Sequence, residues 1–230
     1  MSKTNIDRKL LMAETLRRRI LAMELKPGAV VDEIKLGEEF GISRSPVREL
    51  IRQMAAEGYL ELEENRAARV SGMGYDALRN FFLAAPLLYA VTVRLAAENA
   101  SATEIAALKD IQLEVAKAAR EGDTEGSVYH NNRFHSAIGK MAHNPYLIPS
   151  MERVLIDHAR LGKLFYHREA GADMQQDAYK AVAQHDEIIE AIERRDGDAA
   201  VLLMREHMEL SRRRMAEYVV PSGLEEESGL

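Results

Sequence analysis

The sequence predicts a mainly α protein in two parts: a small helix–turn–helix unit with a β-hairpin, followed by an all-α antiparallel helical bundle. Apolar residues recur three or four positions apart through most of the 230 residues, which is the spacing of amphipathic helices. Strand-like alternation is seen in YLELEE and ARVSG, on either side of the turn NRA. Gly72 and Gly74 then mark a hinge, so we expect domains at 1–71 and 75–219.

The front part reads as three helices before the hairpin. Helical spacing predicts a first helix over 6–25, and KPG at 26–28 ends it because proline cannot continue the hydrogen-bond ladder. Its apolar stripe comprises Ile6, Leu10, Ala13, Leu16, Ile20 and Met23. A short helix over 34–40 ends at Gly41, and a third helix is expected over 45–57.

Behind the hinge the chain reads as a series of helices. The predicted ranges are 76–100, 103–121, 124–142, 145–170, 174–195 and 198–218. Residues with short accepting side chains are the predicted N-caps of the later helices: Thr103, Asp123, Asn144 and Asp198. Pro86 is expected to kink or interrupt the first of these helices, and the acidic tail 220–230 is expected to be disordered.

The composition narrows the class of protein. The chain has no cysteine, which excludes disulfides and thiolate metal sites and fits a reducing cytoplasm. No window comes near the roughly 18 apolar residues that a membrane span needs, so we expect no membrane partner. Residues 1–74 hold 13 basic and 12 acidic residues, a balance of +1, whereas the remainder holds 18 and 25, a balance of −7. Only the front part is therefore suited to approach DNA.

The segment GISRSPVREL, residues 41–50, gathers polar side chains at a helix start. Ser43, Arg44, Ser45 and Arg48 fall at the tip and first turn of the second helix of the pair, which is the part that enters the major groove in a helix–turn–helix. Hydroxyl groups suit phosphates, and arginine can bind guanine O6 and N7 with two parallel bonds. The alternative is an ordinary helix start with solvated arginines.

The run GAVVDEIKLGEEFGISRSPVRELIRQMAAEGYLELEENRAARV resembles the winged helix–turn–helix of the GntR family of bacterial transcription regulators. The resemblance implies a homodimer on double-stranded operator DNA. It also implies these DNA-contacting residues: Lys35, Ser43, Arg44, Ser45, Arg48 and Arg66. Ala67 stands where the family usually has glycine, so the wing would change shape if that glycine has a positive φ.

Three histidines on three predicted helices point toward the interior of the bundle. Each shares a stripe with apolar residues: His135 with Val128 and Ile138, His185 with Val182, Ile189 and Ile192, and His207 with Leu203, Met204 and Leu210. Asn131 lies on the same face as His135, and His158 also lies on an apolar face. Either each histidine is a hydrogen-bonded core residue, or a divalent metal ion, with Zn²⁺ or Ni²⁺ favoured, binds three nitrogens and the Asn131 amide oxygen. His130, His143 and His167 read as surface or cap residues.

The bundle resembles the FCD domain, the all-helical effector domain that follows the DNA-binding domain in many GntR-family regulators. The resemblance rests on NNRFHSAI, QHDEIIEAI and AAVLLMREHM, and it implies metal ligation by His135, His185 and His207. Asn131 replaces the family aspartate, and an amide oxygen is a weaker ligand than a carboxylate. Arg94, Arg160 and Lys163 lie on flanking helices and are the candidate partners of a small carboxylate effector.

The predicted function is therefore a ligand-responsive transcription regulator, a repressor, and not an enzyme. One alternative keeps the regulator but gives it a metal-free pocket for an apolar or acyl ligand, in keeping with the apolar run FFLAAPLLYA. A second alternative is a metal-dependent enzyme. The sequence offers no general base at helical spacing from the histidines, such as the glutamate of H-E-x-x-H, and this disfavours an enzyme.

Overall fold

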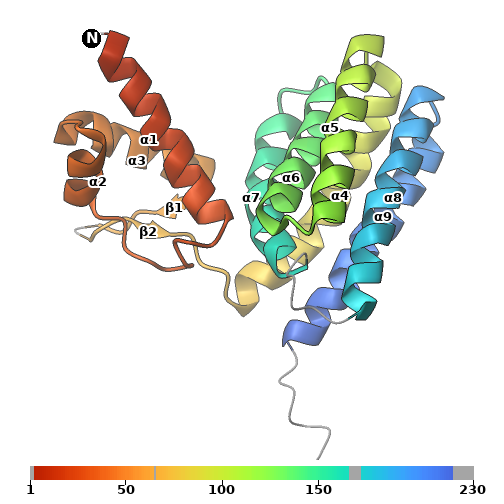
Figure 1. Cartoon of the computed structure of the whole chain (residues 1–230). Coiled ribbons are helices and arrows are strands. Elements are labelled where there is room, and N and C mark those ends of the chain that lie inside the picture. The colour runs from red at the N-terminus through yellow and green to blue at the C-terminus, as the bar shows by residue number, and fades with distance from the viewer. Residues whose placement is uncertain (1–2, 65, 166–171, 220–230) are drawn as a thin grey trace, which may run out of the picture.

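The computed structural model describes residues 3–64, 66–165 and 172–219 of the chain, and over these residues it has nine helices and one two-stranded sheet (Figure 1). The predicted fold class is confirmed, because a winged helix–turn–helix precedes a wholly helical part. The expected disorder of the tail 220–230, the wing residue Asn65 and His167 lie outside the described residues.

The front part consists of three helices and a short hairpin. The elements are α1 (Lys3–Leu21), α2 (Glu33–Phe40), α3 (Arg44–Glu57), β1 (Leu60–Glu61) and β2 (Arg69–Val70). The two strands pair antiparallel with Leu60 opposite Val70, and Val30 adds an isolated bridge to Arg69. The paired segments are shorter than the predicted alternating runs.

The first helix differs from its prediction in both length and buried face. It ends four residues earlier than expected, and Met23, two residues beyond its end, has a left-handed φ of 58°. Met12 is buried, whereas Leu10 is 58% exposed, so the predicted stripe was wrong at that position. The core of the front part is aliphatic and includes Met12, Leu16, Ile20, Val47, Leu50, Ile51, Met54, Leu60 and Val70.

Six helices form the rear bundle, close to the predicted ranges, except that the predicted end of the fourth, 166–170, lies outside the described residues. They are α4 (Tyr75–Asn99), α5 (Ala102–Glu121), α6 (Thr124–Met141), α7 (Leu147–Phe165), α8 (Ala172–Glu193) and α9 (Gly197–Val219). Asp123 and Asn144 accept backbone hydrogen bonds at helix starts as predicted. The other two predicted caps, Thr103 and Asp198, were wrong. Ser101 caps α5, in a reciprocal capping box with Glu104, and Asp196 accepts a hydrogen bond from the Ala199 amide at the start of α9.

Helix α4 is continuous through Pro86, so the proline does not interrupt it. By length and composition alone α4 is long and apolar enough to cross a membrane, with a mean hydropathy of 1.5, which corrects the expectation that no window comes near this length. The helix packs instead against α6, α7, α8 and α9. Its Tyr89 and Val93 are fully buried in the bundle core. Much of its apolar character therefore serves packing within the protein.

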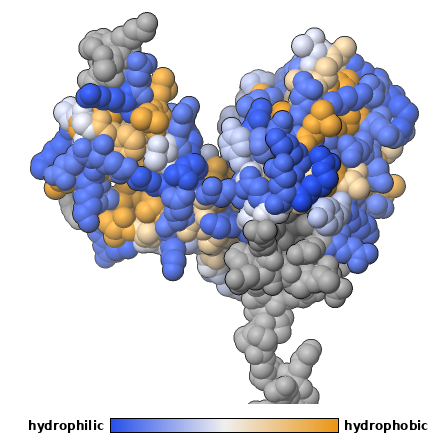
Figure 2. Space-filling view, viewed as in Figure 1, coloured by the Kyte–Doolittle hydropathy of each residue, from blue (hydrophilic) through white to orange (hydrophobic). Residues whose placement is uncertain are grey.

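Helix α7 joins the two parts, because one of its faces contacts the front domain. Arg153 packs so closely over Gly58, the residue that ends α3, that a Cβ on this glycine would lie 2.2 Å from the arginine side chain. Gly58 also has a φ of 91°, which glycine adopts without strain. Two turns further along the same face of α7, the fully buried Arg160 donates hydrogen bonds to Ser71, the last residue before the hinge. In the view of Figure 2, hydrophilic side chains cover much of both parts on the face shown.

Candidate DNA interface and candidate metal centre

The turn between α2 and α3 is built around two glycines. Gly41 ends α2 with a φ of 62°, and its amide bonds back to carbonyl groups of the last turn. A Cβ on Gly37 would lie 2.9 Å from the Ile42 carbonyl oxygen, so the chain passes too close for a side chain at position 37. Ile42 is buried and anchors the turn in the core. This anchoring fixes where α3 begins.

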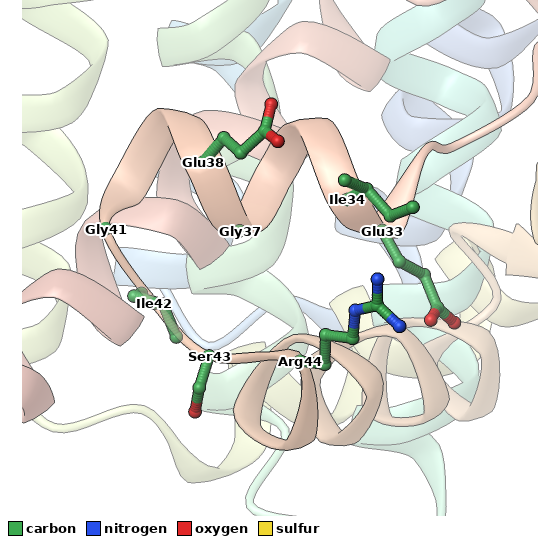
Figure 3. A pocket seen from close by; sticks show the side chains of 8 residues that line it. All are labelled: Glu33, Ile34, Gly37, Glu38, Gly41, Ile42, Ser43 and Arg44. Carbon is green, nitrogen blue, oxygen red and sulfur yellow. The ribbon is translucent and has the colours of Figure 1, made fainter.

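The first residues of α3 face solvent. Ser43, Arg44 and Ser45 are exposed, whereas Pro46 and Val47 directly behind them are buried. Ser43 occupies the N-cap position but makes no side-chain capping bond, which leaves its hydroxyl group available. Ser43 and Arg44 border a hollow of about 480 Å³ between the two helices, and Figure 3 shows Arg44 extending from the start of α3 toward the end of α2 that carries Glu33.

The other predicted DNA contacts are exposed as well, but two of them hold intramolecular partners. The Arg48 Nε donates to Glu33 at 2.8 Å, and Arg66 on the wing pairs with Glu63. Lys35 is exposed on the first turn of α2. Ala67 is not among the non-glycine residues with a positive φ, so alanine fits the wing without backbone strain. A DNA phosphate would have to displace two carboxylates to reach Arg48 and Arg66.

Three histidines from three helices meet inside the bundle. His135 on α6, His185 on α8 and His207 on α9 are all at most 2% exposed, and one ligand atom from each lies within 4.8 Å of the others. Their ring centroids are separated by 5.3 Å for His135 and His185, 5.3 Å for His135 and His207, and 4.8 Å for His185 and His207. The helical stripes of the sequence thus converge on one point.

Several nitrogens of this cluster have no hydrogen-bond partner among the described residues. They are both ring nitrogens of His135, Nε2 of His185 and Nδ1 of His207. Burial lowers the pKa of His135 and of His185 well below the ordinary value, and it lowers the pKa of His207 to about 3. The rings are therefore neutral at pH 7 and carry lone pairs, the form in which imidazole binds metal ions. Buried nitrogens without partners, gathered within 4.8 Å, fit a divalent ion.

A fourth histidine, His158 on α7, lies against this cluster. Its ring centroid is 4.7 Å from that of His135, and its Nδ1 shares a hydrogen bond with the hydroxyl group of the fully buried Tyr89. Burial lowers the pKa of His158 to about 4. Asn131, the predicted amide ligand, is buried one turn before His135 on α6. The interior thus combines four neutral imidazoles with the buried amide of Asn131.

The three basic residues predicted to bind the effector have other partners in the structure. Arg94 pairs on the surface with Asp198 at 2.5 Å. Arg160 donates to the Ser71 carbonyl oxygen at 2.7 Å, and Lys163 donates to the Ala22 carbonyl oxygen at the end of α1. Two of the three thus bridge the domains. Sequence reasoning missed this because a helix pattern does not reveal what packs against its polar face.

Sequence reasoning also missed Gln112 on α5. Its side chain is buried and makes a hydrogen bond to His185. The signal was present in the sequence, since Gln112 interrupts the buried apolar stripe of Ile105, Leu108 and Val115. A polar residue on such a stripe needs a partner inside the core.

Comparison with known proteins identifies the family of both parts of the chain. The family model of the FCD domain matches residues 87–210, more than half of the chain. The family model described as "Bacterial regulatory proteins, gntR family" matches residues 11–70. The HTH-type regulator YdhC of Bacillus subtilis is 25% identical over 188 residues, covering 80% of each chain. The galactonate operon transcriptional repressor of Escherichia coli is 26% identical, covering 88% of this chain and 94% of the repressor.

Among solved structures, Escherichia coli McbR/YncC superposes with a TM-score of 0.75 at 21% identity, covering 94% of this chain and 97% of the other. A GntR regulator from Rhodococcus gives a TM-score of 0.72 at 17% identity, covering 92% and 98%. These two likenesses establish the fold. The matched relatives are transcription regulators and not enzymes. The chain belongs to the gntR family of bacterial regulatory proteins, with an FCD domain behind its DNA-binding helix–turn–helix.

Proposed function

We propose that this regulator works in the cytoplasm as a homodimer that represses transcription from its operator until a small carboxylate metabolite, held with a divalent metal ion, binds the FCD domain. The observation that carries the sensing half of the proposal is the set of buried nitrogens without partners on His135, His185 and His207. Repression is supported by the galactonate operon repressor and by RspR of Escherichia coli, which is 22% identical over 194 residues.

On the DNA side, the proposal rests on the exposed start of α3. The hydroxyl groups of Ser43 and Ser45 can donate hydrogen bonds to phosphate oxygens, and the guanidinium group of Arg44 can donate two parallel hydrogen bonds to guanine. Arg48 exchanges Glu33 for a phosphate when DNA arrives. Lys35 on α2 and Arg66 on the wing are exposed and add positive charge to the DNA-binding domain.

On the sensing side, the three histidines would hold the ion, and Asn131 would add its amide oxygen. A bound Zn²⁺ or Ni²⁺ supplies a Lewis-acidic centre with coordination positions open to a carboxylate. Every one of these ligands is neutral, so an anionic effector would offset the charge of the ion. The name of the galactonate operon repressor points to a sugar acid for that relative, which is a ligand of this chemical class.

The two halves are coupled if the effector has different affinities for two arrangements of the dimer. A change in how the helical bundles of the two subunits pack would alter the spacing of the two α3 helices. The half-sites of an operator require a fixed spacing of these helices. Helix α7 provides a physical route, because it carries His158 on one face and Arg160 on another.

Elemental analysis of the purified chain tests the metal centre. We expect about one zinc or nickel ion per chain in the wild type and none in the double variant His135→Ala/His185→Ala, because two of three nitrogen ligands are gone. The matched control is His143→Ala, which removes an exposed histidine that pairs with Glu104 and should keep the ion. A wild-type chain that binds neither ion would show that the histidines are core residues.

Dimerisation is assigned to the outward face of α4. Leu83, Leu87 and Val91 are spaced four residues apart on this face and are 58%, 71% and 38% exposed. An apolar stripe of this kind on a helix that is already apolar on its buried face is typical of a surface covered by a partner. A second copy is the partner that the symmetry of operator half-sites requires.

We expect Leu87→Glu to convert the dimer into a monomer, because a charge would be buried in the centre of the stripe. Light scattering coupled to size exclusion measures the mass directly. Leu113→Glu is the matched control, since Leu113 is a 67% exposed leucine on α5, and this variant should remain dimeric. If the Leu87 variant keeps the dimer mass, the interface lies elsewhere.

A further inference from the structure

Gln112 is a buried polar side chain in the middle of α5. It is 3% exposed and lies between α5 and α8, on the same helix face as Leu108 and Val115. Its amide nitrogen donates to the Val182 carbonyl oxygen at 2.8 Å. Its amide oxygen lies 3.0 Å from the Nδ1 of His185. Gln112 therefore links the backbone of α8 to a ring that belongs to the histidine cluster.

These two contacts fix which way round the amide lies. A carbonyl oxygen only accepts hydrogen bonds, so the Gln112 group facing Val182 must be the NH₂ group. The opposite orientation would place two oxygens against each other and leave the NH₂ group facing the ring. The amide oxygen of Gln112 consequently faces His185.

The orientation of the amide in turn fixes the tautomer of His185. An amide oxygen only accepts, so the Nδ1 of His185 must carry the hydrogen. In a neutral imidazole the other nitrogen, Nε2, then carries the lone pair. This is the nitrogen of His185 that is buried and has no hydrogen-bond partner among the residues that the structure describes. The plane of the ring is held as well, because Phe134 stacks on it with centroids 3.9 Å apart and planes 13° apart.

We propose that Gln112 is a positioning residue of the sensing site: it holds His185 as the Nδ1–H tautomer and so presents Nε2 to the ion. This inference rests on the proposed metal centre, and it names a residue outside the three histidines on which the affinity of that centre depends. A carboxamide does this without adding a charge, whereas a carboxylate at the same place would partly neutralise the ion through the ring. Partners of this kind typically change metal affinity by about 10- to 100-fold.

The first test uses the metal-free wild-type chain. Nitrogen–proton couplings in the imidazole rings, measured by NMR, report which nitrogen of His185 carries the hydrogen. We expect the Nδ1–H form at pH 7.5. A predominant Nε2–H form in the wild type would overturn the inference without any variant and without any metal.

The second test compares three variants of the full chain. Gln112→Met keeps the volume but removes the acceptor, so we expect a mixture of His185 tautomers and about 10- to 100-fold weaker binding of Zn²⁺ in competition with a chelator. Gln112→Glu in its protonated form keeps an acceptor for Nδ1–H and a hydroxyl donor for the Val182 carbonyl oxygen, so it should preserve the tautomer and retain tighter binding than Gln112→Met. Gln184→Met places the same side chain at a neighbouring buried glutamine of α8 and should leave the tautomer unchanged.

The outcomes separate the two proposals. If the wild type binds no Zn²⁺ but His185 is the Nδ1–H form, the metal centre fails and the control of the tautomer by Gln112 stands. If Zn²⁺ binds equally well to the wild type and to a folded Gln112→Met, Gln112 does not position the ligand although the metal centre stands. Circular dichroism verifies folding, and the measurement on the wild type decides the tautomer even if Gln112→Met does not fold.

Discussion

Lowering the pH from 7 to 5 is expected to remove a large part of the free energy of unfolding of the helical bundle in the metal-free protein. Four histidines, His135, His158, His185 and His207, are fully buried together, and burial lowers the pKa of each. In the unfolded chain the same side chains have a pKa of about 6.5. Below this pH the unfolded state binds more protons than the folded state, so the free energy of unfolding falls as the pH falls.

The expected loss is large because four groups act together. Each contributes about 1.4 kcal/mol per pH unit once the pH is below 6.5, which gives about 2 kcal/mol per histidine and about 8 kcal/mol in total at pH 5. The whole stability of a domain is about 5–15 kcal/mol. The stability is fully present above about pH 6.5, and the loss continues until the folded pKa values, about 4 for His158 and about 3 for His207, are reached.

Urea unfolding followed by circular dichroism between pH 5 and 7.5 measures this dependence. His158→Phe removes one of the four groups and should reduce the slope of unfolding free energy against pH by about a quarter. Met151→Leu changes the same core without removing an ionisable group and should leave the slope close to that of the wild type. A free energy of unfolding that stays constant from pH 7 to pH 5 would contradict the burial of the cluster.

Substitution of Arg44 by alanine is expected to remove most of the specific affinity for operator DNA. The side chain is exposed at the start of α3 and has no hydrogen bond or ion pair among the described residues, unlike Arg48. A bidentate contact of arginine with guanine contributes about 1–3 kcal/mol, and a dimer makes it twice. The loss of both corresponds to roughly 30-fold to more than 10⁴-fold weaker binding.

Fluorescence anisotropy with a selected operator fragment and with a random duplex of equal length measures both affinities. The Arg44 variant should lose affinity mainly for the operator, since base contacts carry the specificity. Arg194→Ala removes an arginine from α8, where it pairs with Glu190, and should bind the operator as the wild type does under matched salt. An Arg44 variant with undiminished preference for the operator would show that other residues read the sequence.

Much of the fold follows from local patterns, and the sites follow only in part. Helical spacing placed His135, His185 and His207 on buried stripes, because the position of a side chain on a helix depends on the sequence alone. The hydrogen bond between Gln112 and His185 joins residues 73 positions apart, so no local pattern contains it. The burial of Arg160 was also missed, because a charged residue on a helix is expected to face solvent unless the domain that covers it is known.

Local competition between neighbouring residues explains the smaller errors. Ser101 caps α5 in place of Thr103 because Glu104 completes a reciprocal box with it. Pro86 lies inside α4 without ending it, and α4 packs against α6, α7, α8 and α9, which stabilise it despite the missing hydrogen bond. The cap of α5 was thus decided by a local side-chain pair, whereas the continuity of α4 depends on packing against other helices.

The bond between Arg160 and Ser71 bears on how the protein can be cut into fragments. A fragment that begins at residue 75 follows the domain boundary of the sequence, but it removes both Ser71 acceptors of the Arg160 guanidinium. That charged group would keep only Asp157, one turn earlier on α7, and would face water across the uncovered surface. A separately expressed bundle therefore needs to begin upstream of Ser71, with the last strand of the wing included.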